Sequence, residues 1–293
     1  MRIPLCSLCI SLISAAAWSA YGQERSESIK IEASTVEVYA TIYDQRNRYV
    51  DNLTRDRFEI RENGRPQQIL SFETSTESLS CAILLDTTGS MNESLPRVKN
   101  SIVKLIDALG PEDAVAIYTF SERLVVNQEF TADKNAAKRA VLRTRAQGRT
   151  ALFDAIAQTT QDISKRAGKK ALIVFSDGDD NASMLNQQSA VLRAQKIGVP
   201  LYAIAEGEAT KSPRLEALLQ GLGKQTGGSA YRAKGADDVE EVFRKISEDL
   251  RHLYMLSYQP ASLASDGKWR KIEVSVTGIK GYRIRGKEGY YPN

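Results

Sequence analysis

The stretch AILLDTTGSM, residues 82–91, joins an apolar run directly to a carboxylate. Its first four residues have the aliphatic character of a buried strand. A charge buried beside such a strand is costly unless it has a partner, so Asp86 needs either water or a cation. The stretch therefore indicates a strand that ends at Asp86, where the chain turns to the surface or something positive balances the carboxylate.

The residues around this stretch, 78–252, alternate between apolar strand-like runs and amphipathic helix-like segments. Residues 95–109 repeat apolar side chains at helical spacing, and Gly110-Pro111 ends that segment. LVVNQEF, 124–130, is expected to form an antiparallel edge strand, and Thr131 to cap the next helix. Alternation of helices with unbroken apolar strands predicts an α/β fold, a doubly wound and mostly parallel sheet with helices on both faces.

The flanking residues, 30–77 and 253–293, lack helical periodicity and carry short strand-like runs. Asn63-Gly64 favours the positive φ angles of a tight hairpin turn. Each set of about three strands would expose an apolar face if it stood alone. We therefore expect both segments to form one small β-sandwich, with the α/β domain of residues 78–252 inserted between them. Two separate β appendages are the alternative.

Residues 1–22 have the features of a secretory signal peptide. Arg2 precedes an apolar run of 14 residues from Leu5 to Trp18, which is shorter than the ~20 residues that cross a bilayer as a helix. Ala20-Tyr21-Gly22 fits a small-x-small cleavage site. Cleavage there predicts a secreted or periplasmic protein without stable membrane insertion, and an uncleaved anchor is the alternative.

Cleavage at this site would leave one cysteine and a nearly balanced charge. Cys6 and Cys9 would be lost, so Cys81 has no intrachain disulfide partner and is expected to be a small buried hydrophobe. Loss of Arg2 alone leaves 39 of the 40 basic residues against 36 acidic residues, a net charge of +3. This balance gives no support to nucleic acid or a membrane surface as a partner.

Side chains with oxygen atoms occur in three segments, each at the predicted end of a strand or start of a helix. Asp86, Thr88 and Ser90 alternate after the first strand, Thr150 begins a helix in GRTALFDAI, and Asp177 ends a strand in VFSDGDDN. Ligands of open α/β sheets bind outside the carboxyl ends of the strands. Two carboxylates and three hydroxyls form a hard oxygen set suited to Mg²⁺, Mn²⁺ or Ca²⁺. Water or a partner's carboxylate would have to complete the coordination shell.

These motifs have a specific resemblance. The patterns D-x-T-G-S, T-A-L-F-D-A-I and S-D-G-x-D-N occur in that order over roughly residues 78–250, which resembles the von Willebrand factor A (VWA) domain. The resemblance implies a Rossmann-like fold and a metal-ion-dependent adhesion site, abbreviated MIDAS. Carried over residue by residue, it implies a divalent-cation site, Mg²⁺ first and Mn²⁺ or Ca²⁺ as alternatives, at Asp86, Thr88, Ser90, Thr150 and Asp177.

Two positions depart from the family pattern. Thr88 stands where the family has a serine, and it keeps the hydroxyl. Arg149 stands where a small residue is common. Its permanent charge could oppose the cation, or it could hold an anionic ligand beside the metal. An Arg149 that points into solvent would do neither.

The segments outside the α/β domain resemble a second pattern. VEVYATIYDQRNRYVDNLTRDRFEIRENGRPQQILSFE and the closing DGKWRKIEVSVTG and YRIRGKEGYY are similar to secreted bacterial VWFA-related proteins of the acidobacterial type. That resemblance implies export and β segments on both sides of one A domain. It implies no particular ligand.

The remaining polar candidates favour structural roles. Asp179 and Asp180 are expected to form a solvated loop, and His252, the only histidine, to sit near the end of the last helix. A basic cluster is expected to be a solvated helix face, and its members are Lys138, Arg143, Arg145 and Arg149. The sequence has no G-x-S-x-G motif and no phosphate-binding loop, so we do not expect an enzyme.

The leading hypothesis is a secreted adhesion or protein-interaction module. Its divalent cation would bind an acidic side chain of an unidentified protein partner. The alternative is a structural or docking protein whose degenerate site holds no metal and whose β-sandwich binds the partner. A hydrolase without a visible signature is the third hypothesis, and turnover of a substrate would support it.

Overall fold

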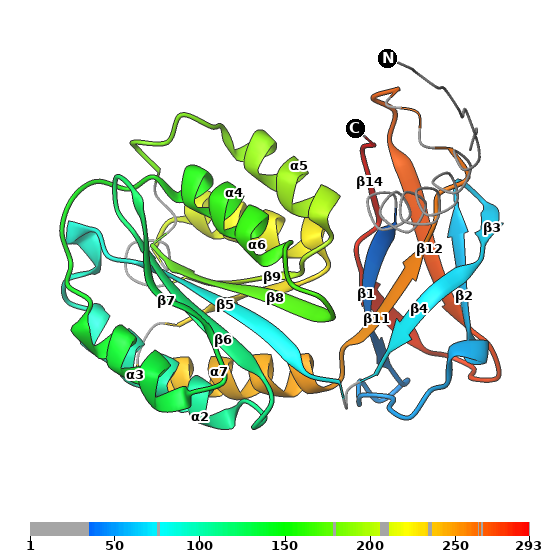
Figure 1. Ribbon diagram of the computed structural model, residues 1–293, viewed down its shortest axis with the longest axis horizontal. Coiled ribbons are helices and arrows are strands. Elements are labelled where there is room, and N and C mark those ends of the chain that lie inside the picture. Colours follow the sequence, from blue (N-terminus) through cyan, green and yellow to red (C-terminus); the bar gives the residue numbers. More distant parts are fainter. Residues whose placement is uncertain are drawn as a thin grey trace, which may run out of the picture. The chain divides into compact units, whose positions relative to one another are not determined.

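The centre of the protein is a six-stranded sheet, built in a computed structural model that describes residues 35–74, 77–177, 180–205, 211–233, 236–262, 264 and 266–292 (Figure 1). The strand order is β10-β9-β8-β5-β6-β7. Neighbouring strands are parallel, except that β7 runs antiparallel to β6 at the edge. The strands are β5 (Leu79–Asp86), β6 (Ala114–Phe120), β7 (Leu124–Thr131), β8 (Lys169–Ser176), β9 (Leu201–Ala205) and β10 (Ser229–Arg232).

Helices cover both faces of this sheet. One face carries α4, α5 and α6, and the other carries α2, α3 and α7 (Figure 1). The helices are α2 (Leu95–Ala108), α3 (Lys134–Arg143), α4 (Leu152–Ile163), α5 (Gln187–Ile197), α6 (Pro213–Thr226) and α7 (Ala236–Arg251). The predicted fold class, a doubly wound and mostly parallel sheet with an antiparallel edge strand, is confirmed.

Strand β5 shows why the strands of the sheet are continuously apolar. Cys81, Ile83 and Leu85 pack into the core under α2 and α7, while Ala82 and Leu84 pack into the core under α4 and α5. Successive side chains of a strand point to opposite faces, and here both faces are covered. Cys81 is a buried free thiol, as predicted from the sequence.

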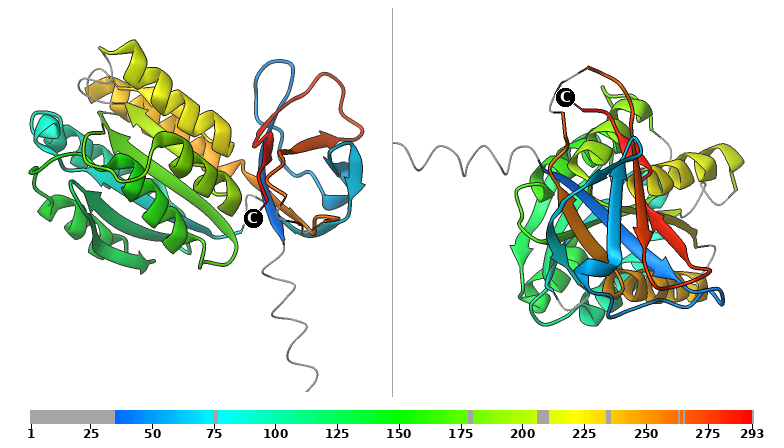
Figure 2. Two further views of the ribbon diagram at one scale, coloured as in Figure 1. Left: turned by 90° about the horizontal axis from the view of Figure 1, so that it is seen from above. Right: turned by 90° about the vertical axis from the view of Figure 1, so that its right-hand side faces the viewer.

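The two ends of the chain together form a β-sandwich of two antiparallel sheets (Figure 2). The strand orders are β13-β1-β11-β4 and β14-β12-β2-β3, so each sheet contains strands from both ends. The strands are β1 (Val36–Tyr43), β2 (Phe58–Glu62), β3 (Arg65–Gln67), β4 (Ile69–Glu73), β11 (Tyr254–Tyr258), β12 (Arg270–Val276), β13 (Arg283–Gly286) and β14 (Gly289–Tyr290). This arrangement agrees with one shared sandwich, although each end supplies four strands instead of the expected three.

Two local predictions have different outcomes. Asn63 and Gly64 have φ angles of 49° and 78° and join β2 to β3, which confirms the hairpin turn. The prediction that Thr131 caps α3 was wrong. Asp133 is the N-cap, because its carboxylate accepts hydrogen bonds from the backbone N–H groups of Asn135 and Ala136. Thr131 is instead the last residue of β7.

The predicted signal peptide, residues 1–22, lies outside the described residues.

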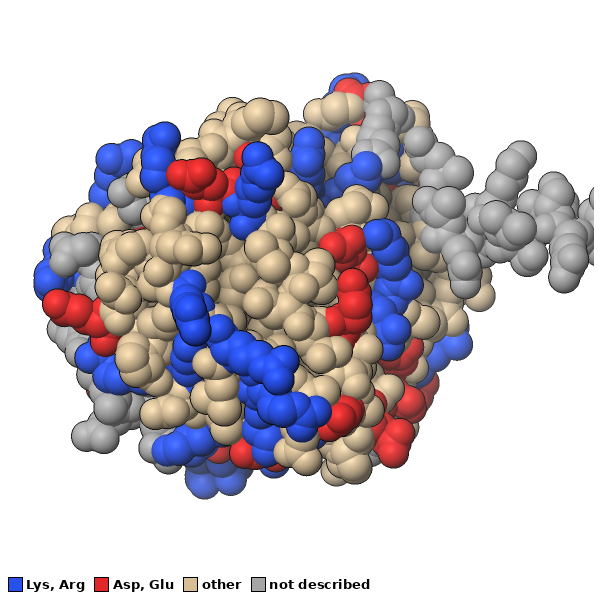
Figure 3. All heavy atoms as spheres, turned by 60° about the vertical axis from the view of Figure 1, so that its left-hand side comes forward, with Lys and Arg blue, Asp and Glu red and all other residues tan. Residues whose placement is uncertain are grey.

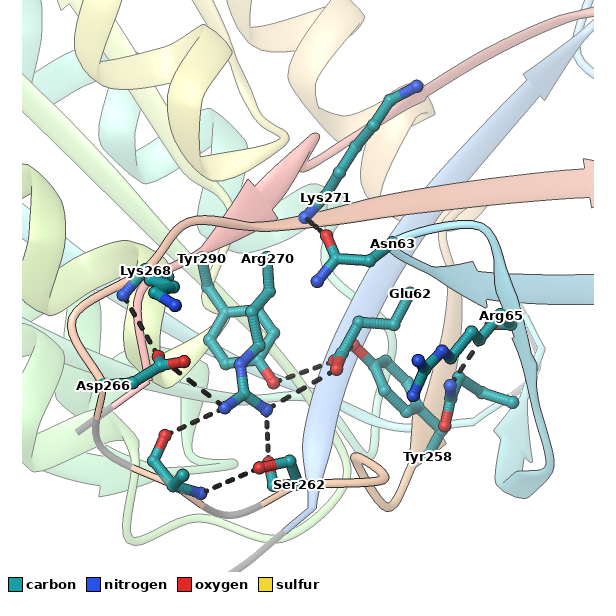
Figure 4. Close-up of polar contacts among 12 residues, drawn as sticks. Glu62, Asn63, Arg65, Tyr258, Ser262, Asp266, Lys268, Arg270, Lys271 and Tyr290 are labelled. Carbon is teal, nitrogen blue, oxygen red and sulfur yellow. Dashed lines mark hydrogen bonds and ion pairs between the residues drawn. The ribbon is translucent and has the colours of Figure 1, made fainter.

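A buried ion pair connects the sandwich to the loop between β11 and β12 (Figure 4). The Glu62 carboxylate accepts hydrogen bonds from the hydroxyls of Tyr258, at 2.6 Å, and Tyr290, at 2.9 Å. The Arg270 guanidinium lies 3.5 Å from Glu62 and also donates to the carbonyls of Ser262 and Ala264. Because buried charges are stable only when they are paired and hydrogen-bonded, this network holds the backbone at Ser262 and Ala264.

Polar contacts also join the sandwich to the α/β domain. The Lys170 ammonium lies 2.9 Å from the Glu37 carboxylate. Farther along the same face of the sandwich sheet, Arg285 of β13 pairs with the fully buried Asp249 of α7, which also accepts a 3.1 Å hydrogen bond from Tyr43. Every charge in these contacts therefore has a partner across the junction.

Lys287 is a buried cation with weaker compensation. Lys287 is 4% exposed. Its ammonium donates one long hydrogen bond, 3.5 Å, to the Gln195 carbonyl and lies 5.6 Å from the centre of the Tyr290 ring. Burial lowers the pKa of Lys287 to about 8, against an opposing effect of the Glu37 charge. Below pH 8 the folded state therefore bears the desolvation cost of the charged form.

We expect Lys287→Met to raise the free energy of unfolding by about 1–3 kcal/mol at pH 7, because it removes this cost while keeping the side-chain length. The gain should fall as pH rises from about 8 to 10.5, where the wild-type folded state is already neutral and the unfolded state is still protonated. Urea denaturation across this pH range measures the effect, with the exposed Lys268→Met as the control. A loss of stability in Lys287→Met would contradict the prediction.

Candidate metal centre

Asp86 is a fully buried carboxylate at the carboxyl end of β5. Its Oδ1 accepts a 2.9 Å hydrogen bond from the backbone N–H of Thr88, and its Oδ2 accepts a 2.8 Å hydrogen bond from the Ser176 hydroxyl. Burial raises the pKa of Asp86 to about 7, and the nearby charge of Asp177 adds to the rise. The negative charge is therefore unfavourable here unless a cation joins the site.

The next two oxygens follow directly along the chain. Thr88 and Ser90 place their hydroxyl oxygens 3.0 Å apart at the start of a short 3-10 helix, Gly89–Met91. Thr88 is buried and Ser90 is exposed. The loop after β5 thus presents one carboxylate and two hydroxyls between the interior and the surface, as the alternation in the sequence predicts.

Thr150 is held between two other loops. Its backbone N–H donates to the Asn181 side chain at 3.1 Å, and its carbonyl accepts from the Asn181 N–H at 3.0 Å. The loop before it is bonded to the loop after β5, since the Gln147 N–H donates to the Thr87 carbonyl at 2.6 Å. Backbone contacts therefore bring the segment of Thr150 against the segments of the other site residues.

Asp177 completes the predicted set at the carboxyl end of β8. Its side chain is buried, and its charge acts on Asp86. The structure thus brings all five predicted residues to one end of the sheet, with direct hydrogen bonds among Asp86, Thr88 and Ser90. Among the residues that the structure describes, no three His, Cys, Asp or Glu side chains converge as a metal site. A metal here would depend on hydroxyl oxygens as well as two carboxylates.

Sequence reasoning missed the residues that position this site. Ser176 bonds Asp86, and Asn181 bonds Thr150; both stand inside the S-D-G-x-D-N motif. Asp180 lies in a loop, as predicted, but it is half-buried and hydrogen-bonded instead of simply solvated. Its carboxylate accepts from the Phe153 N–H at 3.0 Å and from the Ser183 hydroxyl at 2.7 Å. Asp179 lies outside the described residues.

Asp180 acts as an N-cap supplied by another segment. Helix α4 begins after Ala151, which has no side-chain oxygen to satisfy the first N–H groups. Asp154, in the first turn, accepts in return from the backbone N–H groups of Met184 and Leu185, at 2.8 and 2.9 Å. The start of α4 and the loop 180–185 therefore hold each other beside Thr150.

Arg149 lies along this same loop. Its guanidinium is exposed and donates a hydrogen bond to the carbonyl of Asn181. Arg123, Arg143 and Arg145 are also exposed. Lysine and arginine side chains form a band across the face of the molecule that Figure 3 shows. Lys138 forms a 2.7 Å ion pair with Asp107, so this member of the predicted basic cluster has an acidic partner.

The single histidine, His252, directly follows the C-terminal end of α7 and lies away from the loops of the candidate site. Its Nδ1 lies 2.6 Å from Oδ1 of Asp51, and its ring stacks on Tyr49 with 4.2 Å between centroids. His252 therefore joins α7 to the β-sandwich, in agreement with the structural role that its sequence position indicates.

The family model for the von Willebrand factor type A domain matches residues 81–245. The chain belongs to this family. The matched region contains all five candidate metal ligands, and the VWA domain is thereby established as the α/β part of the chain.

Solved structures show the same fold at low sequence identity. A von Willebrand factor type A protein from Catenulispora acidiphila matches with a TM-score of 0.53 and 14% identity, over 94% of this chain and 76% of that one. Proximal thread matrix protein 1 from the mussel byssus matches with 0.51 and 14%, over 65% and 51%. The PilB minor pilin from Streptococcus sanguinis matches with 0.50 and 11%, over 60% and 61%. Among proteins with curated descriptions, none matches the sequence.

We expect Asp180→Ala to lower the free energy of unfolding by about 1–2 kcal/mol, because α4 loses the carboxylate that caps its N-terminus. The matched control is Asp162→Ala, because Asp162 lies on α4 and is partly exposed in an ion pair with Lys165. This substitution should lower the free energy of unfolding by less than about 0.5 kcal/mol. Urea denaturation of both variants makes the comparison. Equal effects of the two substitutions would show that Asp180 does not act as a cap.

Proposed function

We propose that this protein is a secreted interaction module whose VWA domain binds an acidic side chain of a protein partner through a divalent cation. The ligands would be Asp86, Thr88, Ser90, Thr150 and Asp177, with Mg²⁺ as the expected ion and Mn²⁺ or Ca²⁺ as alternatives. The observation that carries the proposal is the fully buried Asp86 carboxylate, whose charge is disfavoured by burial and by Asp177.

The donor set suits this chemistry. Oxygen ligands of mixed charge fit hard divalent cations, and two carboxylates leave the ion with coordination positions for water or a partner. When bound, the cation would supply a positive centre that attracts a carboxylate. The chain's part is to hold its hydroxyls in place, which the contacts of Ser176 with Asp86 and of Asn181 with Thr150 support.

Export of the protein is proposed from its N-terminal sequence and from the likeness of its outer segments to secreted bacterial VWFA-related proteins. Within the part of the chain that the structure describes, no helix combines the length and apolar character that crossing a membrane requires. No catalytic constellation is proposed, since VWA domains generally serve as interaction modules and His252 pairs with Asp51.

The first test of the proposal is stabilisation by metal. We expect Mg²⁺ or Mn²⁺ to raise the melting temperature, since an ion that binds only the folded state adds about 2.7 kcal/mol at a hundred times its Kd. Asp86→Ala should abolish the rise. Ser164→Ala, which removes a partly exposed hydroxyl at the end of α4 and far from the site in the chain, should keep the rise in melting temperature. Equal melting temperatures of the wild type in metal and in EDTA would favour the alternative, a metal-free site with docking through the β-sandwich.

Arg149 provides the second test. A guanidinium near a divalent cation repels it, so Arg149→Gly should tighten Mn²⁺ binding by about three- to tenfold. Arg149→Gln is the more informative variant, because its amide can still donate to the Asn181 carbonyl while its charge is gone. Calorimetry of Mn²⁺ with the three proteins measures the effect. Indistinguishable affinities would show that Arg149 exerts no electrostatic influence on the site.

A further inference from the structure

Two aromatic side chains stand together on the outer surface of the β-sandwich. Arg270 of β12 pairs with Tyr290 of β14 in antiparallel register, and both side chains are buried toward Glu62 (Figure 4). Successive residues of a strand point to opposite faces, so Trp269 and Tyr291 face outward as neighbours. Their rings meet edge to face with centroids 5.1 Å apart, and they are 40% and 43% exposed.

The Trp269 ring is fixed in place although it is exposed. It lies against Gly289, where an added Cβ would come within 2.4 Å of the indole. Arg270, which follows Trp269, forms the ion pair with Glu62, and Tyr290, which precedes Tyr291, donates its hydroxyl to the same carboxylate. Large exposed aromatic rings that are held rigid bind partners at a low cost in conformational entropy.

Trp269 and Tyr291 line one wall of a groove, and residues of α5 and α6 in the α/β domain form a polar wall opposite them. Its volume is about 480 Å³, within the usual range of small-ligand sites. Gln188 of α5 and Gln225 of α6 line it, and both are exposed. Gln195 also lines it, but it is buried and its amide donates to the Gln225 carbonyl at 3.0 Å, so it supports the wall.

We propose that this groove, between α5, α6 and the β12–β14 edge, binds a neutral oligosaccharide. A pyranose ring has one face of C–H groups, which suits the negative face of an aromatic ring, and a rim of hydroxyls that both donate and accept. The carboxamides of Gln188 and Gln225 also donate and accept, so they match those hydroxyls. Rigid rings on one wall and amides on the other give each part of a sugar its partner.

The charges of the groove favour a ligand without net charge. Lys224 and Glu288 line the groove and carry opposite charges. An acidic or a basic polymer would therefore be attracted by one of them and repelled by the other. The groove also shares no residue with the candidate metal centre. Sugar binding should therefore be the same in Mg²⁺ and in EDTA, which separates this proposal from the proposed metal-dependent function.

Tryptophan fluorescence offers a direct test. The chain has two tryptophans, so in full-length Trp18→Phe protein the emission reports Trp269 alone. The probes are the neutral hexasaccharides of cellulose, xylan, mannan, laminarin, amylose and chitin, each titrated to about 10 mM, which covers weak single-site binding. We expect saturable quenching or enhancement by at least one, with the same Kd from calorimetry on the unmodified chain.

Variants then assign the binding to the groove. By calorimetry, Trp269→Ala should lower affinity at least tenfold, Trp269→Phe should retain most of it, and Gln225→Ala should lower it about three- to tenfold. Leu142→Ala, an exposed apolar residue on α3, is the control and should bind as the wild type does. Since Gln225 is an exposed side chain, its variant tests the proposal even if Trp269→Ala fails to fold.

Two results would overturn the proposal. One is the absence of saturable binding with all six sugars. The other is binding of an oligoproline peptide in their place, since aromatic grooves also accept polyproline helices. Binding of a sugar that neither Trp269→Ala nor Gln225→Ala weakens would likewise place the sugar elsewhere and reject the groove.

Discussion

The constraint on which the structure depends is that the central sheet is covered on both faces. No side chain of β5 between Leu79 and Asp86 reaches solvent to a significant extent. Polar chemistry is therefore excluded from the length of the strand and can appear only where the strand stops. Asp86 stands at that point, and Ser176 and Asp177 stand at the corresponding end of the neighbouring strand β8.

This constraint also explains what could be predicted from the sequence. Unbroken apolar runs identify strands buried on both faces, and polar residues directly after them identify the functional end of the sheet. The fold class, the β7 edge, the hairpin at Asn63-Gly64 and the position of the five oxygens follow from such local patterns. Each pattern consists of residues close together in the chain, and the rule that strand ends of a parallel sheet meet at one edge brings the three site segments together.

Features that depend on distant contacts could not be predicted in the same way. The cap of α4 comes from Asp180, which lies 27 residues after Phe153 in the chain, and no spacing rule connects them. The outward pairing of Trp269 with Tyr291 requires the register of β12 with β14. The Thr131 prediction failed for another reason, since Asp133 competes for the same helix start and is better placed to reach the N–H groups of Asn135 and Ala136.

The mixed origin of the β-sandwich has a consequence for how the chain folds. Strand β1 lies between β11 and β13, so Val38 pairs with Leu256 and Ile42 with Ile284. Closing such long loops costs entropy before any contact is gained, and folding dominated by distant pairs is slow. The cores of the VWA domain pack within its own segment, whereas β1 and β4 must wait for β11 to be synthesised, and only the β2–β3 hairpin can pair before it. During that interval their unpaired edges are exposed to aggregation, and a holding chaperone would benefit the N-terminal strands most.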